Sequence, residues 1–365
     1  MKKQIIKIIF FAFFILTLGS CRDPIFYTIS QEEKQLEPLI KGSPTNFVKF
    51  NTNIYVGSGT TLYKYNGQYP NNPARGDWTL STPGGNIRQL AATNSEMYAL
   101  CGESENFILK KSSDGSNWSN VTSTGIIVQA IYSANNSLFV GTGTSGAHSI
   151  YYYNGSSFTN LADTSDKLLN GAAHDGSTYY LSVKSLITES GGGIYTASTL
   201  TQLSAQLIGN SADIPFMGII NLGTNSIAAI SRREGVLYTV TSSGVTNTNH
   251  KLGNDKLATG ALLVWNSNLL LAGRQDEMKN SINYLHGYRE LELSSGSIIG
   301  ADFRDPGTHS PSTVDNNATY RSTLEKNPVK HLFQADDGTL FASTYTNGVW
   351  SYRLRNNRWQ WNSEQ

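Results

Sequence analysis

The sequence of 365 residues has few charged side chains and little excess charge of either sign. Only 15% of the residues are charged, and 28 lysines and arginines nearly balance 27 acidic residues. A chain without a basic excess lacks the electrostatic footprint of a nucleic-acid-binding protein, so we expect no nucleic-acid partner. The two cysteines, Cys21 and Cys101, are too few for a disulfide framework.

Motifs of catalytic and cofactor sites are also missing. The sequence contains no Walker loop, nucleophile elbow, H-E-x-x-H or EF-hand pattern. We therefore predict no catalytic residue, no metal site and no cofactor. The paired carboxylates of a glycosidase can come from any two loops, so that chemistry stays open. The six histidines are scattered singly without metal-ligand spacing: His148, His174, His250, His286, His309 and His331.

The only long hydrophobic run lies near the N-terminus. Ile8 to Leu18 is an apolar segment of eleven residues that follows Lys2, Lys3 and Lys7. A run of this length is too short to cross a bilayer as a permanent helix, and a basic segment before it is typical of a secretion signal. We predict a signal peptide over residues 1–20.

The end of this signal resembles a lipobox, the sequence recognised in the processing of bacterial lipoproteins. The four residues "LGSC" end at Cys21. The resemblance implies that the Cys21 thiol receives a diacylglyceryl group, that the chain is cut before it, and that the new amine is acylated, for example with palmitate. Two or three acyl chains, at roughly 0.8 kcal/mol per buried CH₂, anchor a protein to a membrane. The alternative is that Cys21 merely follows an ordinary signal peptide.

The same resemblance places the protein in the bacterial cell envelope. Arg22, rather than an aspartate, follows the cysteine, and this implies the outer membrane, on its periplasmic side or surface. Residues 21–45 are polar and form the predicted tether between lipid and domain. With Cys21 lipidated, Cys101 has no disulfide partner, and its apolar neighbours predict a small buried side chain.

Beyond the tether, one short apolar phrase recurs with a regular period. Its seven copies start 43, 41, 41, 47, 43 and 71 residues apart. A period near 42 residues with β character is typical of a propeller. The copies begin at Ile54, Met97, Leu138, Tyr179, Ser226, Leu269 and Leu340.

Each phrase is accompanied by three further strands in a constant order. An apolar strand precedes it, such as "IRQLA" or "VKHLF", and an aromatic-rich and then a polar strand follow it. In the sixth unit these are the predicted third strand "INYLHG" and fourth strand "YRELEL". Such a sheet is apolar on both faces, so neighbouring sheets must cover one another. We predict an all-β, seven-bladed β-propeller of four-stranded antiparallel blades over residues 46–365; an open sandwich array or two smaller barrels are the alternatives.

One turn resembles the Asp-box of sialidase-like propellers. The segment "SSDGSNW" runs from Ser112 to Trp118, and the resemblance implies a structural turn role for Asp114. An active sialidase needs an arginine triad, but within the blades only Arg75 and Arg88 precede Arg232. We therefore expect no sialidase activity. The chain as a whole resembles bacterial envelope lipoproteins that carry a seven-bladed, kelch-like or Asp-box-like propeller.

The predicted ligand face is the one where the turns between second and third strands meet the links between blades. These loops are longer or more charged in blades four to six, and a polar insertion over residues 294–327 follows blade six. Long loops on a rigid scaffold often carry binding sites. Alternatively, the charges only keep exposed loops soluble. The candidate residues are Arg232, Arg233, Arg274, Asp276, Glu277, Arg304 and Asp305.

Together these observations predict a lipid-anchored propeller that acts as a non-catalytic binding or scaffold module. Its expected partners are the membrane, through the covalent lipid, and a protein or glycan ligand. Two alternatives remain: a carbohydrate-active enzyme of the glycosidase type, and an outer-membrane assembly factor.

Overall fold

The fold was analysed in a computed structural model of the chain. Contacts divide the chain into two units, 1–38 and 39–365. The structure describes residues 39–66, 78–103, 107–121, 125–144, 147–187, 191–223, 226–276, 286–306, 324, 327–355 and 358–364. The predicted signal peptide and lipidation site lie outside the described residues, as does most of the predicted tether.

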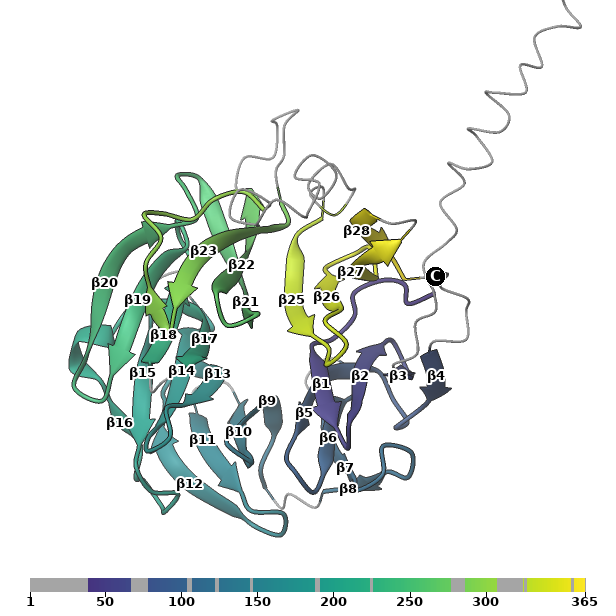
Figure 1. The fold of residues 1–365 in the computed structure, drawn as a ribbon. Coiled ribbons are helices and arrows are strands. Elements are labelled where there is room, and N and C mark those ends of the chain that lie inside the picture. The colour runs from purple at the N-terminus through teal and green to yellow at the C-terminus, as the bar shows by residue number, and fades with distance from the viewer. Residues whose placement is uncertain are drawn as a thin grey trace, which may run out of the picture. The chain divides into compact units, whose positions relative to one another are not determined.

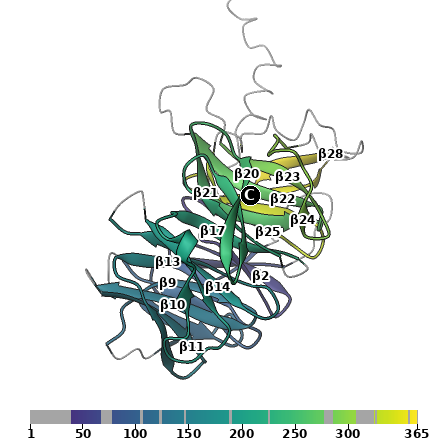
Figure 2. The same cartoon turned by 90° about the vertical axis from the view of Figure 1, so that its left-hand side faces the viewer.

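The unit 39–365 consists of seven antiparallel sheets, each of four consecutive strands. The predicted seven-bladed β-propeller is therefore confirmed. Figure 1 shows the first strand of each blade nearest the centre of the ring, and Figure 2 shows the blades following one another when seen from the side.

The strands of blades 1 to 4 follow the predicted phrases. They are β1 (Phe47–Phe50), β2 (Asn53–Ser58), β3 (Thr61–Tyr65) and β4 (Trp78–Ser81); β5 (Ile87–Ala92), β6 (Met97–Cys101), β7 (Ile108–Ser112) and β8 (Ser119–Asn120); β9 (Val128–Ala134), β10 (Ser137–Thr144), β11 (Ala147–Tyr153) and β12 (Phe158–Asp163); β13 (Lys167–His174), β14 (Tyr179–Ser185), β15 (Gly192–Ala197) and β16 (Gln206–Leu207).

Blades 5 to 7 complete the ring. A 3-10 turn, η2 (Gly209–Ser211), precedes them. Their strands are β17 (Phe216–Gly223), β18 (Ser226–Ser231), β19 (Val236–Thr241) and β20 (Gly244–Lys251); β21 (Lys256–Trp265), β22 (Leu269–Asp276), β23 (Tyr288–Ser294) and β24 (Ser297–Ile298); β25 (Val329–Gln334), β26 (Leu340–Thr344), β27 (Val349–Arg355) and β28 (Arg358–Ser363).

The strand assignment in blade 6 corrects the sequence prediction. The segment "YRELEL" forms β23, the third strand, and not the fourth. The fourth strand is the two-residue β24, which lies inside the predicted insertion 294–327. Further along this segment Phe303 is buried, and the backbone of Arg304 pairs with that of Glu290. The first part of the predicted insertion therefore packs against blade 6.

Burial between blades holds the ring together. Among the described residues, seven buried hydrophobic clusters occur, one between each pair of neighbouring blades. The second strands are covered on both faces, and all five residues of β6 and of β26 are buried. Because apolar surface removed from water stabilises by about 25 cal/mol per Å², each blade depends on both of its neighbours.

Glycine near the end of a second strand lets the next blade approach closely. A Cβ added at Gly57 in β2 would lie 2.8 Å from Cγ2 of Ile87, and one at Gly141 in β10 would lie 2.8 Å from Cβ of Leu169. Both contacts join a second strand to the first strand of the following blade. A larger side chain at either position would push neighbouring blades apart.

The chain closes its ring by joining the first blade to the last. Leu39 N donates to Glu364 O at 2.8 Å, and Gly348 N donates to Gly42 O at 2.9 Å. The buried Glu364 carboxylate accepts a bond from Trp78 Nε1 of blade 1 at 2.9 Å. Residues 39–45, part of the predicted tether, therefore lie against blade 7 as part of the compact unit.

Candidate functional site

Side chains from the innermost strands line the centre of the ring. In four of these strands, β5, β9, β13 and β25, a buried apolar residue at or near the start is followed by a polar residue that lines the central space. The alternation of sides along a strand explains this arrangement, since one face packs on the neighbouring blade and the next residue points away from it. The polar residues are Arg88 of β5, Gln129 of β9, Asn170 of β13 and Lys330 of β25.

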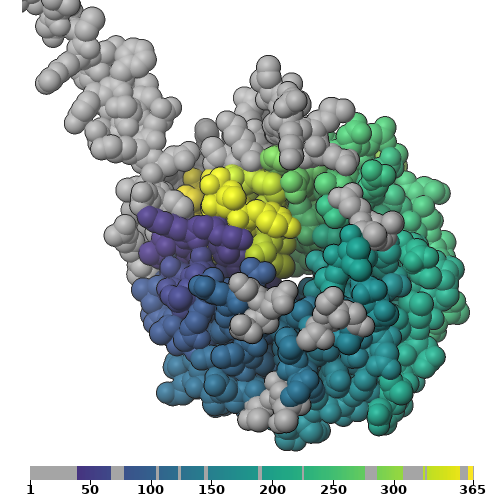
Figure 3. All heavy atoms as spheres, turned by 180° about the vertical axis from the view of Figure 1, so that it is seen from behind, coloured from purple at the N-terminus to yellow at the C-terminus, as the bar shows by residue number. Residues whose placement is uncertain are grey.

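These side chains line a hollow that we call the central cavity. Its volume is about 950 Å³. The turns between second and third strands and the segment before β1 form its rim, so it opens on the face that the sequence predicted for the ligand. Figure 3 shows the ring hollowed at its centre on this face. The lining residues are Leu39, Lys41, Gly42, Ser43, Ser58, Gly59, Tyr63, Asn86, Ile87, Arg88, Gln89, Gln129, Ala130, Tyr132, Leu168, Leu169, Asn170, Lys184, Lys330, His331 and Tyr345.

The charges that line the central cavity have one sign. Lys41, Arg88, Lys184 and Lys330 are basic, and none of the described lining residues is an aspartate or glutamate. Nearly equal numbers of basic and acidic residues in the whole chain make this segregation informative. A concave site lined by one sign of charge concentrates ligands of the opposite sign.

Lys330 and Arg88 lie on one side of the central cavity. Lys330 Nζ donates to Pro44 O at 3.0 Å and to Ser43 Oγ at 3.4 Å. Burial lowers the pKa of Lys330, and the positive charge of Arg88 lowers it further. The Arg88 guanidinium also lies 5.6 Å from the centre of the Phe107 ring, a cation–π contact that holds it without neutralising its charge.

Lys184 approaches the central cavity from the end of β14. Burial lowers the pKa of its ammonium group, and the charge of Arg232 adds to this effect. Burial raises the pKa of Tyr345, and the positive charge of Arg232 opposes this shift. Among the residues that the structure describes, neither Lys184 nor Arg88 has a carboxylate partner.

Two titratable groups in the central cavity are neutral at physiological pH. Burial lowers the pKa of His331 to about 3, and the charge of Lys330 contributes. Burial raises the pKa of Tyr132 to about 12, opposed by its hydrogen bond with Gln89. The positive charge of the central cavity therefore comes from lysine and arginine alone, and histidine protonation does not alter it near neutral pH.

Among the described residues, those predicted to form the ligand face do not lie together in one patch. Arg232 lies near the central cavity, as its effect on Lys184 shows. The backbone of Arg233 pairs with Leu257 of β21. The side chain of Asp276, and Glu277 as a whole, lie outside the part of the chain that the structure describes.

Arg274 and Asp305 come together in blade 6. The Arg274 side chain is only 1% exposed, and its Nη1 lies 3.3 Å from Asp305 Oδ1. Arg289 Nε lies 3.3 Å from the same oxygen. Arg274 Nε donates to His286 O at 3.1 Å. This burial leaves Arg274 no solvent-facing surface for a ligand, whereas Asp305 remains partly exposed.

Arg88, Lys330 and Lys41 were not among the predicted site residues, because that prediction relied on long or charged loops. The signal that identifies two of them is positional. Arg88 and Lys330 each follow the buried first residue of an innermost strand, in "IRQLA" and "VKHLF". Aligning these strands across the seven repeats would have placed both side chains in the central cavity.

The turn between β7 and β8 forms around Asp114. Its Oδ1 accepts hydrogen bonds from the backbone N–H groups of Ser116 at 2.7 Å and Asn117 at 2.8 Å. These bonds, with the Asn117 amide and the Ser112 hydroxyl, lower the pKa of the Asp114 carboxyl. The carboxylate is thus occupied in holding the turn, the role that the resemblance implied.

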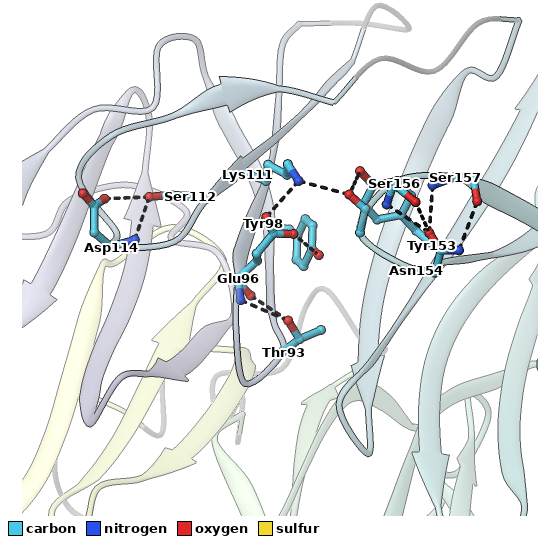
Figure 4. A network of polar contacts seen from close by, with 11 residues as sticks. Thr93, Glu96, Tyr98, Lys111, Ser112, Asp114, Tyr153, Asn154, Ser156 and Ser157 are labelled. Carbon is cyan, nitrogen blue, oxygen red and sulfur yellow. Dashed lines mark hydrogen bonds and ion pairs between the residues drawn. The ribbon is translucent and has the colours of Figure 1, made fainter.

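A second cationic site, shown in Figure 4, contrasts with the central cavity. Lys111 Nζ lies 2.8 Å from Glu96 Oε1 and donates to Gly155 O of blade 3 at 3.1 Å. Tyr98 Oη donates to Glu96 Oε2 at 2.8 Å. The hydrogen bond to Glu96 raises the pKa of Lys111. This network, which we call the Lys111 network, ties blade 2 to blade 3.

The remaining features concern Cys101, metal ligands and membrane-spanning helices among the described residues. Cys101 is buried as predicted, and burial raises the pKa of its thiol to about 11, which leaves it unreactive at neutral pH. Within the described ranges, no group of three or more His, Cys, Asp or Glu side chains could hold a metal ion. In the same ranges, no helix is both long and apolar enough to cross a membrane.

Comparison with known proteins adds evidence for the fold. No family model and no curated protein matches the sequence. The structure of YCF48 bound to D1 peptide has a TM-score of 0.56 at 12% identity, covering 86% of this chain and 92% of that one. YCF48 from Cyanidioschyzon merolae has a TM-score of 0.54 at 11% identity, covering 87% and 96%.

A glycoside-hydrolase structure is also similar. The GH74 enzyme of Niastella koreensis has a TM-score of 0.59 at 13% identity, covering 90% of this chain and 54% of that one. This chain thus spans about half of the enzyme's length. At such identities the likeness concerns the propeller fold alone.

Proposed function

We propose that this protein is a lipid-anchored binding or scaffold module of the bacterial cell envelope, without catalysis, and that its central cavity holds a negatively charged part of a protein or glycan. The anchor rests on the "LGSC" sequence that ends at Cys21. The ligand site rests on the structure of the ring.

One observation carries the ligand site. Arg88, Lys184 and Lys330 line a cavity of about 950 Å³ whose described lining contains no carboxylate. Charges kept apart from counter-charges cost stability through mutual repulsion and desolvation. An anionic ligand would offset this cost on binding, because it supplies the missing counter-charge.

The comparison with YCF48 supports a binding role. That propeller is described as bound to D1 peptide, so a ring of similar fold occurs in complex with a peptide. The sequence identity of 12% is too low to transfer that ligand to this chain. The support is for the kind of activity and not for the partner.

The enzymatic alternative takes its support from the GH74 neighbour. A glycosidase needs two carboxyl groups about 5–5.5 Å apart for retention, or about 6.5–9.5 Å apart for inversion. The described lining of the central cavity supplies no carboxyl group. A glycan-hydrolysis screen distinguishes the two functions, since turnover of any glycan would contradict a purely binding role.

A direct test of the binding role uses immobilised polymers. The full-length chain, purified in detergent, is passed over polyglutamate, polygalacturonate and neutral dextran. We expect retention on at least one anionic polymer and none on dextran, and loss of retention in the triple variant Arg88→Gln/Lys184→Gln/Lys330→Gln. Absence of retention on both anionic polymers would contradict the ligand site.

The control for this test is Lys49→Gln. Lys49 is a partly exposed lysine that pairs with Asp336 at 2.7 Å and does not line the central cavity. Its replacement removes one positive charge from the chain without changing the cavity, so retention should persist.

The anchor is tested separately. Cells producing the wild-type chain or Cys21→Ser are labelled with radioactive palmitate and fractionated. We expect label and membrane association in the wild type only, because the lipid attaches through the Cys21 thiol. Equal labelling of both chains would contradict lipidation at this residue. A pull-down from solubilised membranes then shows whether the partner is an outer-membrane assembly protein.

A further inference from the structure

Apart from Lys41, which precedes β1, the cations in and beside the central cavity form two groups on different sides of the ring. Arg88 and Lys330 come from blades 2 and 7, which flank blade 1. Lys184 comes from blade 4, and Arg232 follows β18 of blade 5. Each pair is close enough for one charge to lower the pKa of the other group. A seven-bladed ring places blades 4 and 5 across the centre from blade 1.

This arrangement favours a ligand with more than one negative charge. A single small anion placed beside Lys330 neutralises one group and leaves Lys184 without a counter-charge. A chain that crosses the central cavity with separated anionic groups reaches both. Charge complementarity of this kind fixes the orientation of a ligand as well as its rate of association.

The walls between the two groups indicate what else the ligand carries. Gln129 donates to Gly143 O at 2.7 Å and Asn170 donates to Phe216 O at 2.9 Å. Neither side-chain carbonyl oxygen accepts a hydrogen bond within the described part of the chain, so both can accept from the N–H groups of an extended peptide.

Apolar side chains complete these walls. Leu168, beside Asn170, and Leu39, in the segment before β1, line the central cavity and are partly exposed, whereas Ile87 and Leu169 are buried between blades. Aliphatic surface of this kind favours contact with apolar side chains, since water is released from both partners. The hydroxyl groups of a sugar gain nothing from such a wall and lose hydrogen bonds to water.

We infer that the ligand of the central cavity is an extended acidic segment of a protein, with carboxylates spaced to reach both Lys330 with Arg88 and Lys184, and with apolar side chains between them. This inference rests on the proposed function and narrows it from an anionic protein or glycan to an acidic peptide segment.

The test measures binding of three labelled octapeptides by fluorescence anisotropy at low salt. One alternates glutamate with leucine, one has a single glutamate at its end, and one has glutamine in place of every glutamate. The full-length chain in detergent is titrated against each, with unlabelled oligogalacturonate as competitor. The protein variants are Lys184→Gln, Lys330→Gln and the control Lys49→Gln.

We expect the alternating peptide to bind at least tenfold more tightly than either of the others. Lys184→Gln and Lys330→Gln should each weaken it by about tenfold, as loss of a charge-assisted hydrogen bond does. Lys49→Gln should leave the affinity unchanged. Cooperative urea unfolding with midpoints no lower than that of the wild type establishes that the variants are folded.

Three results would overturn the inference in distinguishable ways. If oligogalacturonate binds with dependence on Lys184 and Lys330 but the alternating peptide does not, the ligand is a glycan and the proposed function stands. If neither anion binds, both the inference and the proposed ligand site fail. Peptide binding that is insensitive to both lysines would also overturn the inference.

Discussion

Lysine has opposite surroundings in two regions of this propeller. In the Lys111 network, the ammonium group lies 2.8 Å from a Glu96 oxygen, and this contact raises its pKa. In the central cavity, Lys184 and Lys330 are enclosed beside other cations, and their pKa values are lowered. The same side chain therefore stabilises the fold in one region and costs stability in the other.

The difference separates structural charge from charge that is available to a ligand. Lys111 already has its counter-charge and bridges two blades through Gly155 O. Arg88 and Lys184 have no carboxylate partner among the described residues. A site that keeps cations together without acids has a physical reason to bind anions.

The largest expected effect on stability separates the two regions. Lys111→Met should lower the free energy of unfolding by about 1–3 kcal/mol, because it leaves the Glu96 carboxylate without its charged partner. Lys184→Met should either raise the free energy of unfolding or lower it by less than about 0.5 kcal/mol. Urea unfolding of the full-length chain measures both, and a larger loss for Lys184→Met would reverse the distinction.

Salt should weaken the binding of an anionic ligand in the central cavity. Raising the ionic strength screens attraction between exposed or partly exposed charges. We expect the affinity for polyglutamate to fall at least severalfold between about 50 and about 500 mM salt, because association depends on the cationic lining. An affinity that does not change with salt would show that contacts other than charge dominate.

The pH dependence of stability should differ in sign between the two regions. Lys184 and Lys330 bind protons more weakly in the folded chain, so their contribution makes stability rise as pH increases from the lowered pKa values towards 10.5. Lys111 binds its proton more tightly when folded, so its stabilisation is complete below 10.5 and is lost as pH rises through the raised pKa.

Urea unfolding at several alkaline pH values checks these signs. Lys184→Met/Lys330→Met should remove the rise, whereas Lys111→Met should remove the loss above pH 10.5. Identical pH profiles for the two variants would contradict the opposite pKa shifts.

The smallest expected effect is that of pH between 5 and 8 on ligand affinity, because no histidine in the described lining of the central cavity gains charge in this range. Because the pKa of His331 is about 3, the imidazole stays neutral from pH 5 to 8. Binding of a sulfonated polymer, whose charge is constant in this range, should therefore keep the same affinity across it. Tighter binding as the pH falls from 7 to 5, lost in His331→Gln, would show that this residue acquires charge in the central cavity.

The fold could be predicted because burial imposes a period. Second strands such as β6 and β26 are buried along their whole length, so their apolar phrases recur visibly in the sequence. The fourth strand of blade 6 could not be predicted in this way. β24 has only two residues, which is too few to show an alternating pattern, so the alternation of β23 was assigned to the wrong place.

The site was harder to predict because it depends on the closed ring. Arg88, Lys184 and Lys330 are distant in sequence and meet only around the centre. The candidate residues were chosen because the loops of blades 4 to 6 are longer or more charged, and all seven came from blades 5 and 6 and the segment that follows. In that region Arg274 is buried beside Asp305, a contact between segments that no local pattern reveals.

The central claim is that the cations of the central cavity serve an anionic ligand. Its most direct test is the unfolding temperature of the full-length chain with and without saturating polyglutamate, for the wild type and for Arg88→Gln/Lys184→Gln/Lys330→Gln. A ligand that binds only the folded state must raise this temperature. We predict a rise in the wild type that is absent in the triple variant; an equal shift in both chains, or none in either, would contradict the claim.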